Sequence, residues 1–478
     1  MNVPSYESLG FAAAVAVAIN LSSAARWRRS VLLVANLLLI LTFTRNPAQL
    51  APFAALLLLG FAGMKLLERR KSRALLWTVL GVLLIVFCAL KRYTFVPAAL
   101  TLPFVYFTVG MSYVFFRVLH LVIDAYQEAL PERVGFLSYA NYTLNFTALV
   151  SGPIQFYRDY RRNESAEPSR LDAAAASHGA KRIIIGFFKV SALSPLLLYA
   201  QGHAVIALSV ASALGERVVD ASVATAAFPL FLYFNFSGYT DVVIGVARFL
   251  RFELPENFNK PFGARGFIDF WGRWHMTLSN WMKTYVYSPL LLGLMRRYPP
   301  RSVEPLLGTI AYFVAFFSIG LWHGQTSMFV CFGVLLGLGV SVNKLYQTFM
   351  IARLGRAGYR ALTSQPLYAA CSCGLTLTYF AFATLWFWSS WTQLGHIGSV
   401  LGAAGTAASL ATTFAGVTVL AAAWNAVDGA DRARWFGARF APASPYLQTA
   451  WLTALVVLTL SITVALNAPA PHIVYRAF

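Results

Sequence analysis

Charged residues are scarce in this chain. Asp, Glu, Lys and Arg make up 12% of its 478 residues, whereas 58% are hydrophobic and the mean hydropathy is +0.62. Soluble domains carry roughly 25% charged residues, so this balance excludes an ordinary soluble globule. The apolar runs are unbroken and lack the alternating segments of about ten residues typical of a transmembrane β-barrel. Because backbone groups in hydrocarbon must be hydrogen-bonded internally, the sequence predicts an all-α polytopic membrane protein.

Acidic residues are fewer still, 18 against 38 Lys and Arg, which gives a net charge of +20. The basic residues lie in short clusters between apolar runs, as at 26–29 and 69–73. This distribution is what the positive-inside rule predicts for cytoplasmic loops, and it is not typical of a nucleic-acid-binding surface. We therefore expect contact with membrane lipid, no nucleic-acid partner, and an amino terminus outside the cytoplasm.

The chain also lacks the common signatures of metal and hydrolase sites. Its four cysteines lie within or beside apolar runs, and no matching Cys/His set accompanies Cys371 and Cys373. There is no GxSxG elbow, P-loop, GxGxxG or HExxH motif. These absences disfavour a serine hydrolase, a nucleotide-binding enzyme and a metal site, and we expect free thiols and no tightly bound cofactor.

The apolar runs predict about twelve spans, within a range of 11 to 13. They lie near 9–25, 30–45, 48–67, 74–90, 96–123, 183–211, 222–250, 305–322, 326–345, 366–390, 397–424 and 449–467. A further run, 134–156, ends in Gly152-Pro153, which breaks a helix, so a re-entrant piece is expected there. We predict one domain over 1–478, with peripheral helices to about 130, a core over about 131–365 and further helices over about 366–478.

Three ionisable residues lie inside the fifth run. Arg117, His120 and Asp124 follow one another at spacings of three and four, so they share one face of a helix. Lipid does not tolerate such a face, which must meet a cavity, a ligand or protein groups. One interpretation is a binding site for an anionic group, and the other is a structural set that bonds to neighbouring helices.

Two histidines each follow a tryptophan. His323 lies in GLWHG, where Gly320 and Gly324 allow close backbone approach. An imidazole with an ordinary pKa near 6.5 suits a general base that activates a hydroxyl, but a helix-end histidine bonded to a carbonyl fits the residues equally well. His275 lies among aromatic residues that predict a horizontal helix at the membrane interface, and this interpretation favours a structural role for it.

The same stretch carries three tryptophans, Trp271, Trp274 and Trp281, and two tyrosines, Tyr285 and Tyr287. Tryptophan is enriched at membrane–water interfaces, so they are expected to form an aromatic belt there. Arg273 and Lys283 lie between them and are candidates for contact with lipid head groups or with an anionic substrate.

Several motifs together resemble one known family, the membrane-bound O-acyltransferases, and within it the bacterial branch of alginate O-acetylation and teichoic-acid D-alanyl transfer proteins. The matching segments are NFSGYTDVVIG from 235, LPENFNKPF from 254, FWGRWHMTLSNWMKTYVYSPL from 270 and WHG from 322. SGPIQFYRDY from 151 and the ending PHIVYRAF from 471 resemble further family segments. The chain departs from the family's pattern at Asn235, Gly272, Lys283 and Thr284.

The resemblance implies a ring of helices around a central tunnel in the bacterial inner membrane. A cytoplasmic acyl thioester, acetyl-CoA or an acyl-carrier protein, would enter one end, and a hydroxyl acceptor would enter the other. An extracytoplasmic acyltransferase or a polysaccharide would be the partner on the far side. His323 is implied as general base, with His275 assisting. The candidate substrate-binding residues include two from the polar face of the fifth run, Arg117 and His120. The others are Trp322, Asn257, Asn259, Arg273, Trp274, Ser279, Lys283, Tyr239 and Asp241.

These features predict an O-acyltransferase for cell-envelope or exopolysaccharide modification, with acetyl as the favoured acyl group. D-alanyl transfer from a carrier protein to a teichoic-acid-like polymer or a partner protein is the alternative within the same class. A secondary transporter or flippase is the alternative from another class, because transporters also hold ionisable residues at mid-membrane.

Overall fold

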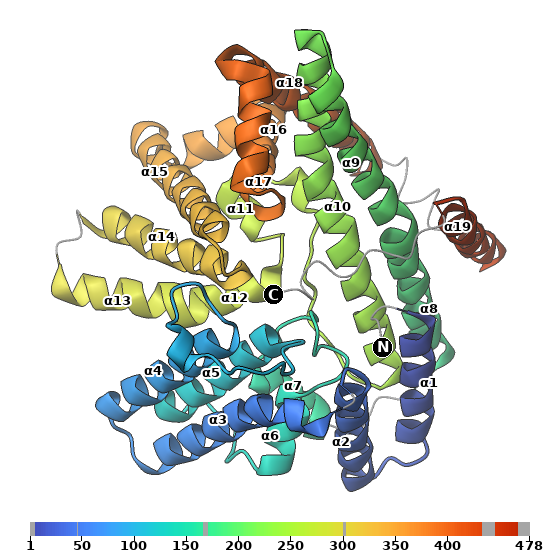
Figure 1. Cartoon of the computed structure of the whole chain (residues 1–478), viewed down its shortest axis with the longest axis vertical. Coiled ribbons are helices and arrows are strands. Elements are labelled where there is room, and N and C mark those ends of the chain that lie inside the picture. The colour runs from blue at the N-terminus through green and yellow to red at the C-terminus, as the bar shows by residue number, and fades with distance from the viewer. Residues whose placement is uncertain (1–4, 45, 166–170, 300–302, 433–444, 467–478) are drawn as a thin grey trace.

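The computed structural model of the protein describes residues 5–44, 46–165, 171–299, 303–432 and 445–466 (Figure 1). Every regular element within these ranges is a helix, and nine of the helical segments are long and apolar enough to cross a membrane. The predicted all-α polytopic membrane fold is therefore confirmed.

The N-terminal helices occupy the lower part of Figure 1. They are α1 (Tyr6–Asn20), α2 (Ala25–Thr42), α3 (Ala51–Arg69), α4 (Arg73–Leu90), α5 (Met111–Gln127), α6 (Phe136–Thr143) and α7 (Tyr157–Ser165). Helix α5 packs against α3 and α4, and most of its residues are buried. It is therefore the innermost helix of this group.

The next helices form the right side of Figure 1. They are α8 (Ala173–Phe188), the π-helical turn Lys189–Leu193, α9 (Ser194–Val210) and α10 (Leu214–Phe249). The long helix α10 contacts α8, α9, α16 and α18, and its second half is almost entirely buried. Helix α10 thus joins the N-terminal helices to the C-terminal ones.

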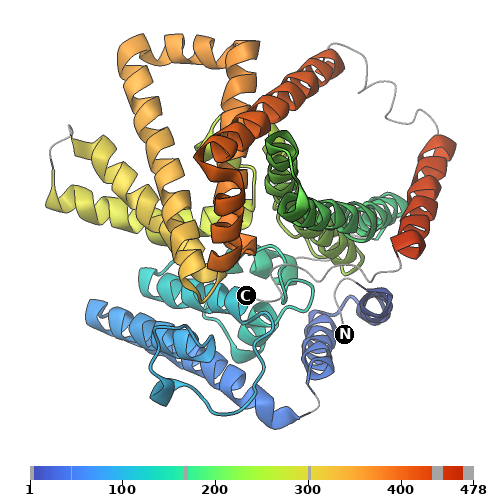
Figure 2. The same ribbon diagram turned by 45° about the horizontal axis from the view of Figure 1, so that its top comes forward.

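The remaining helices lie on the left and at the top of Figure 1, except α19, which lies beside α8. They are α11 (Phe267–Trp271), α12 (Met276–Met282), α13 (Ser288–Arg297), α14 (Glu304–His323), α15 (Ser327–Ser364), α16 (Pro366–Ala383), α17 (Leu385–Trp388), α18 (Trp391–Arg432) and α19 (Pro445–Leu466). Figure 2 shows the sharp bend of α15, which occurs at Gly355, where φ is 70°. A left-handed glycine of this kind interrupts a helix without steric strain.

The number of span-like helices is smaller than the predicted 11 to 13. Among the described residues, the runs at 9–25 and 96–123 give helices of only 15 and 17 residues, α1 and α5. The run at 30–45 belongs to α2, whose first turn contains Arg26, Arg28 and Arg29. The run at 134–156 contains only the eight-residue α6, which ends at Thr143, well before the helix break predicted at Gly152-Pro153. A membrane crossing needs about 20 apolar residues. The apolar runs discussed here are shorter than this once the polar residues at their ends are excluded.

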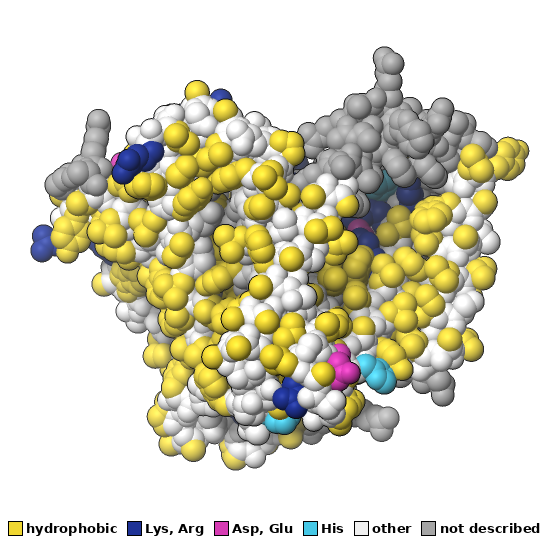
Figure 3. All heavy atoms as spheres, turned by 90° about the horizontal axis from the view of Figure 1, so that it is seen from above, with side chains coloured by type: hydrophobic (Ala, Val, Ile, Leu, Met, Phe, Trp, Pro, Cys, Tyr) yellow, Lys and Arg dark blue, Asp and Glu magenta, His cyan; other side chains and the backbone are white. Residues whose placement is uncertain are grey.

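The outer surface carries many large apolar side chains. Figure 3 shows hydrophobic side chains over most of the face seen from above, with few charged groups among them. Helix α19 is the clearest case, since Leu447, Trp451 and Val464 are each more than half exposed. Such a surface suits lipid and not water.

The predicted interfacial tryptophan belt is wrong. Trp271, Trp274 and Trp281 are 4%, 1% and 4% exposed and pack in the interior. Trp274 lies against Phe270 and Phe380, with ring centroids 5.4 and 5.1 Å away. Spacing and residue type could not separate an interface from a core, because tryptophan is common in both.

Close packing of α14 on α15 generates a prediction. A Cβ atom at Gly320 would lie 2.1 Å from the Cα atom of Gly333 and 2.4 Å from its nitrogen, so Gly320→Ala forces the two backbones apart. We expect a loss of about 1–3 kcal/mol, the usual cost of overpacking. Thermal unfolding of the detergent-purified protein measures it.

Gly416→Ala in α18 is the matched control, because a Cβ there meets nothing within 4 Å. It should leave the melting temperature equal or slightly higher, since Ala favours a helix by roughly 0.5–1 kcal/mol over Gly. Equal behaviour of the two variants would contradict the observed packing.

Candidate functional site

His275 lies at the start of α12, a helix near the middle of the molecule in Figure 1. Its backbone is left-handed, with φ of 44°, an uncommon conformation for a residue with a side chain. The side chain is 1% exposed, and its ring packs in a T-shaped arrangement with the ring of Phe236 from α10, with the ring centroids 4.8 Å apart. A buried histidine in a strained conformation of this kind must be stabilised by its surroundings, and one residue makes several of the stabilising hydrogen bonds.

That residue is Asn257, which is fully buried in the loop after α10. Its side-chain Oδ1 lies 3.3 Å from His275 Nδ1 and accepts a hydrogen bond from the Thr277 hydroxyl at 2.6 Å. Its backbone carbonyl accepts from the Met276 amide at 2.9 Å. Asn257 therefore fixes the backbone on the C-terminal side of His275 and the orientation of its ring.

These contacts define the protonation state of His275. Burial lowers its pKa to about 3, so the ring is neutral near pH 7. Because Asn257 Oδ1 only accepts, the ring hydrogen belongs on Nδ1, and Nε2 is left as the acceptor. The hydroxyl of Tyr113, in the first turn of α5, lies 3.4 Å from Nε2 and donates to it.

His323 ends α14 and is 3% exposed. Its ring lies against Trp322, Phe387 and Phe332, with centroids 4.8, 5.2 and 5.8 Å away. A Cβ at Gly324 would meet the ring of Phe329 at 2.0 Å, so this position needs glycine for space. The turn that follows His323 is thus tightly packed.

The two histidines belong to one assembly. The ring of Tyr113 stacks on His275 and meets Trp322, the neighbour of His323, at 5.6 Å. Sequence reasoning named both histidines, Trp322 and Asn257, and the structure brings these four together.

Sequence reasoning missed Tyr113, Phe236 and Phe387. Tyr113 could have been found, because it precedes Arg117 by four residues and therefore shares its helix face. Phe236 could also have been found, because it lies in the NFSGYTDVVIG segment. Phe387 carries no signal in the sequence, since an aromatic residue in an apolar helix is usual.

Arg117 and His120 bond to the protein itself. The guanidinium of Arg117, 2% exposed, donates to the carbonyls of Thr143 at 3.0 Å and Ala148 at 2.7 Å. His120 Nε2 accepts from the Tyr157 amide at 3.1 Å. These contacts are those of the structural interpretation, and a role in substrate binding stays a prediction.

Tyr239 and Asp241 lie further along α10 than Phe236. Tyr239 is 1% exposed. Asp241 turns toward α8, where it accepts from Arg182 at 3.0 Å and from Lys189 at 2.6 Å. Asp241 therefore lies in an ion cluster with α8, and contact with substrate is untested for both residues.

The other candidates surround the histidine assembly. Trp274 is buried, whereas Asn259 and Lys283 are exposed. Arg273 donates to Asp269 at 2.8 Å, and the hydroxyl of Ser279 lies 3.5 Å from the Trp274 carbonyl. The structure leaves their predicted contacts with substrate untested, as it does the central tunnel. The PHIVYRAF segment lies outside the described residues.

Within the described ranges no group of three His, Cys, Asp or Glu side chains could hold a metal ion. The four cysteines are free thiols. The site therefore offers two imidazoles, a tyrosine hydroxyl and a buried amide.

The sequence model of the membrane-bound O-acyltransferase family matches residues 75–382, more than half of the chain. The protein belongs to this family. The matched region contains α5, the Asn257 loop and both histidines, whereas Phe387, which contacts His323, lies just beyond it.

Named relatives fall into three groups. A teichoic acid D-alanyltransferase of Bacillus subtilis is 28% identical over 229 residues, 47% of this chain and 56% of the relative. A protein named probable alginate O-acetylase from Pseudomonas fluorescens is 29% identical over 302 residues, 62% and 57% of the two chains. A peptidoglycan O-acetyltransferase of Helicobacter pylori is 32% identical over 213 residues, which are 44% of this chain and 38% of the relative. The matches to the first two relatives span a little over half of their length.

The contacts of Arg117 generate a prediction. Arg117→Met removes the donors from buried carbonyls, and each orphaned carbonyl costs about 1–3 kcal/mol. The variant should therefore melt well below wild type without any substrate present, as thermal unfolding in detergent would measure. Arg162→Met, whose side chain is 72% exposed, is the control and should melt like wild type. Wild-type stability in Arg117→Met, with only a raised KM, would instead indicate a substrate contact.

Proposed function

We propose that the protein transfers an acyl group, acetyl in the first place, from a cytoplasmic thioester to a hydroxyl acceptor for cell-envelope or exopolysaccharide modification. The observation that carries the proposal is the buried assembly of His275, Tyr113, Trp322 and His323 within the region matched by the family. Two of the three named relatives are O-acetylating proteins by name.

His323 acts as the general base. Its imidazole takes the proton from the acceptor hydroxyl while the hydroxyl oxygen attacks the thioester carbonyl carbon. The carbon–sulfur bond then breaks, the thiolate leaves, and it receives the proton from the imidazolium. The products are an ester and a free thiol. General-base catalysis of this kind contributes roughly 10²–10⁴-fold in rate.

His275 positions the reacting groups and does not itself take the proton. Its Nδ1 hydrogen is directed at Asn257, and its Nε2 accepts from Tyr113, so its neutral form is fixed. Asn257 has a second function, which is to offer a hydrogen-bond donor to the substrate, because its Nδ2 group is buried without a hydrogen-bond partner. A buried unpaired donor is costly in the free protein and is ready to donate to a substrate oxygen.

The donor is acetyl-CoA or an acyl-carrier protein, and it approaches from the cytoplasmic side. The acceptor is a polysaccharide, or an extracytoplasmic acyltransferase that passes the group on. The protein then belongs in the bacterial inner membrane with its amino terminus outside, as the basic clusters at 26–29 and 69–73 favour. D-alanyl transfer is the second candidate, because one relative is a teichoic acid D-alanyltransferase by name.

The test measures ester-linked groups released from the envelope and secreted polymers of a deletion strain by mass spectrometry. Complementation with wild type should restore one acyl ester, and its mass distinguishes acetyl from D-alanyl. His323→Gln should restore it at a rate lower by about 10²–10⁴-fold at matched protein levels, because the general base is lost.

His178→Gln is the control, since His178 is exposed on α8, away from the assembly, and should restore the ester fully. Full restoration by His323→Gln would rule out His323 as the base. An unchanged ester profile in every strain would contradict acyl transfer itself and favour transport.

A further inference from the structure

A second site lies away from the histidines. A cavity of about 610 Å³ lies between α1, α8 and the C-terminal end of α10. Most of its wall is apolar: Leu9, Ala13, Ala16, Ile183, Val246 and Phe249. From Leu9 to Asn20 it follows α1 for about 16 Å at 1.5 Å per residue. Two polar side chains, Asn20 and Arg251, lie in its wall where α1 and α10 end.

Arg251 occupies a position that favours glycine. Helix α10 ends in a paired-bond cap in which the Phe252 amide donates to the Ala247 carbonyl at 2.8 Å and the Arg251 amide to that of Arg248 at 3.0 Å. This cap puts its central residue in the left-handed region, and Arg251 has φ of 58°. The strained position brings a guanidinium to the end of the cavity.

A second arginine, Arg28, lies beside the helix cap but is not part of the cavity wall: its guanidinium carbon is 5.7 Å from the ring centroid of Phe252, the residue after Arg251. Arg28 is 5% exposed, and its Nε and Nη2 atoms are buried without a hydrogen-bond partner, as is Nε of Arg251. Burial, and after it the charge of Arg251, lowers the pKa of Arg28. Two close, partly desolvated cations repel each other unless an anion lies between them.

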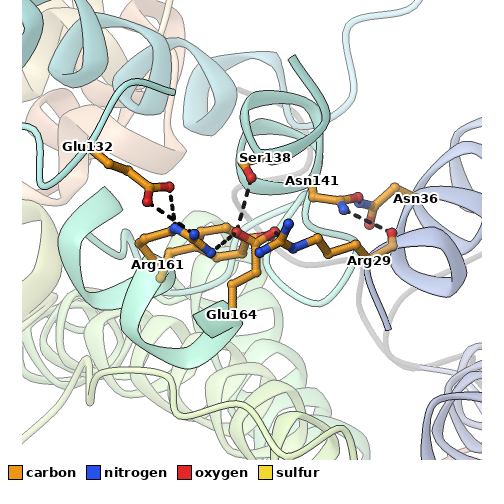
Figure 4. A network of polar contacts seen from close by, with 8 residues as sticks. Arg29, Asn36, Glu132, Ser138, Asn141, Arg161 and Glu164 are labelled. Atoms are coloured by element: carbon orange, nitrogen blue, oxygen red, sulfur yellow. Dashed lines mark hydrogen bonds and ion pairs between the residues drawn. The ribbon is translucent and has the colours of Figure 1, made fainter. Parts of the chain in front are cut away.

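Among the residues that the structure describes, the two acids Glu164 and Glu253 are engaged elsewhere. Glu164 is bound by Arg161 at 3.0 Å, Ser138 at 3.1 Å and Arg29 at 3.5 Å, as Figure 4 shows. Glu253 pairs with Arg248 at 3.2 Å. Glu164 acts on Arg28 only from beyond ion-pair distance. The charge of the Arg28–Arg251 pair is therefore left for a ligand.

Asn20 adds a different requirement. Its Nδ2 donates to the Ala16 carbonyl at 2.7 Å and to the Phe249 carbonyl at 3.0 Å, so Oδ1 is the remaining atom. Oδ1 is buried and has no donor. An amide oxygen accepts and cannot donate, so it needs a hydroxyl or an N–H group from the ligand.

We propose that this cavity binds an anionic phospholipid whose head group carries a free hydroxyl, of the phosphatidylglycerol type. The phosphate lies between Arg251 and Arg28, the hydroxyl donates to Asn20 Oδ1, and one acyl chain lies along the alanine face of α1. The inference does not depend on the acyl-transfer reaction.

The walls favour a lipid over a soluble anion. Helices α8 and α10 belong to candidate membrane spans, and the groove between them and α1 is apolar over most of its length. The basic cluster of 26–29 lies in the first residues of α2, six positions after Asn20. Arginines at the end of membrane helices are the usual recognition elements for anionic head groups.

The experiment uses the full-length protein purified in detergent. Native mass spectrometry and thermal unfolding compare phosphatidylglycerol, phosphatidylcholine and phosphatidylethanol, which has the same charge as phosphatidylglycerol but no hydroxyl. Wild type should retain phosphatidylglycerol selectively and melt at a higher temperature with it than with the other two. Inorganic phosphate should give no comparable rise, because it cannot fill the apolar part.

Arg251→Gly is the decisive variant, because glycine suits the left-handed position and preserves the turn. It should melt at or above wild type without lipid and bind phosphatidylglycerol about tenfold or more weakly, the effect of one lost charge-assisted hydrogen bond. Ala16→Phe fills the groove without touching a charge and should also lose the lipid. Arg356→Ala, an exposed arginine on α15, should bind like wild type.

The proposal falls if phosphatidylcholine binds as well as phosphatidylglycerol, if Arg251→Gly keeps the preference, or if inorganic phosphate stabilises wild type equally. Equal binding of phosphatidylethanol would overturn the assignment of the hydroxyl to Asn20.

Discussion

The site depends on one buried amide. Asn257, with no exposed surface, holds the Met276 amide with its carbonyl and holds Thr277 and the His275 ring with its side chain. Thr277 in turn accepts from the Ile154 amide at 3.1 Å, so the segment after α6 is attached to the same point. Three stretches of chain far apart in sequence therefore meet at Asn257. These bonds hold His275 in its left-handed conformation, together with the contacts of its ring with Tyr113 and Phe236.

The second histidine is held by packing. His323 lies in an aromatic shell at the end of α14, and the Tyr93 hydroxyl donates to the neighbouring Leu321 carbonyl at 2.9 Å. Tyr113 joins the two arrangements, because it bonds to His275 and meets Trp322. A rigid, water-poor setting of this kind is what an activated hydroxyl needs, since any reorganisation would have to occur during the reaction.

Composition and long apolar runs predicted the fold class, because the requirement for internal backbone bonding leaves few alternatives in lipid. They did not separate spans from short buried helices, as α1 and α5 show. At the site, the WHG motif and the LPENFNKPF segment identified His323 and Asn257. The burial of Trp271, Trp274 and Trp281 could not be predicted, because an aromatic residue suits both interface and core. Phe387 comes from a helix more than 60 residues after His323, and only the tertiary fold brings it there.

The central claim is that His275 and His323 act as one unit. The most direct test is a double-mutant cycle on acyl transfer by the purified protein, with His275→Gln, His323→Gln and the pair measured by kcat/KM. Groups that act together are strongly non-additive, so the double variant should lose little more than His323→Gln alone. If the two losses instead multiply, the histidines act independently, and the Tyr113–Trp322 connection between them carries no catalytic role.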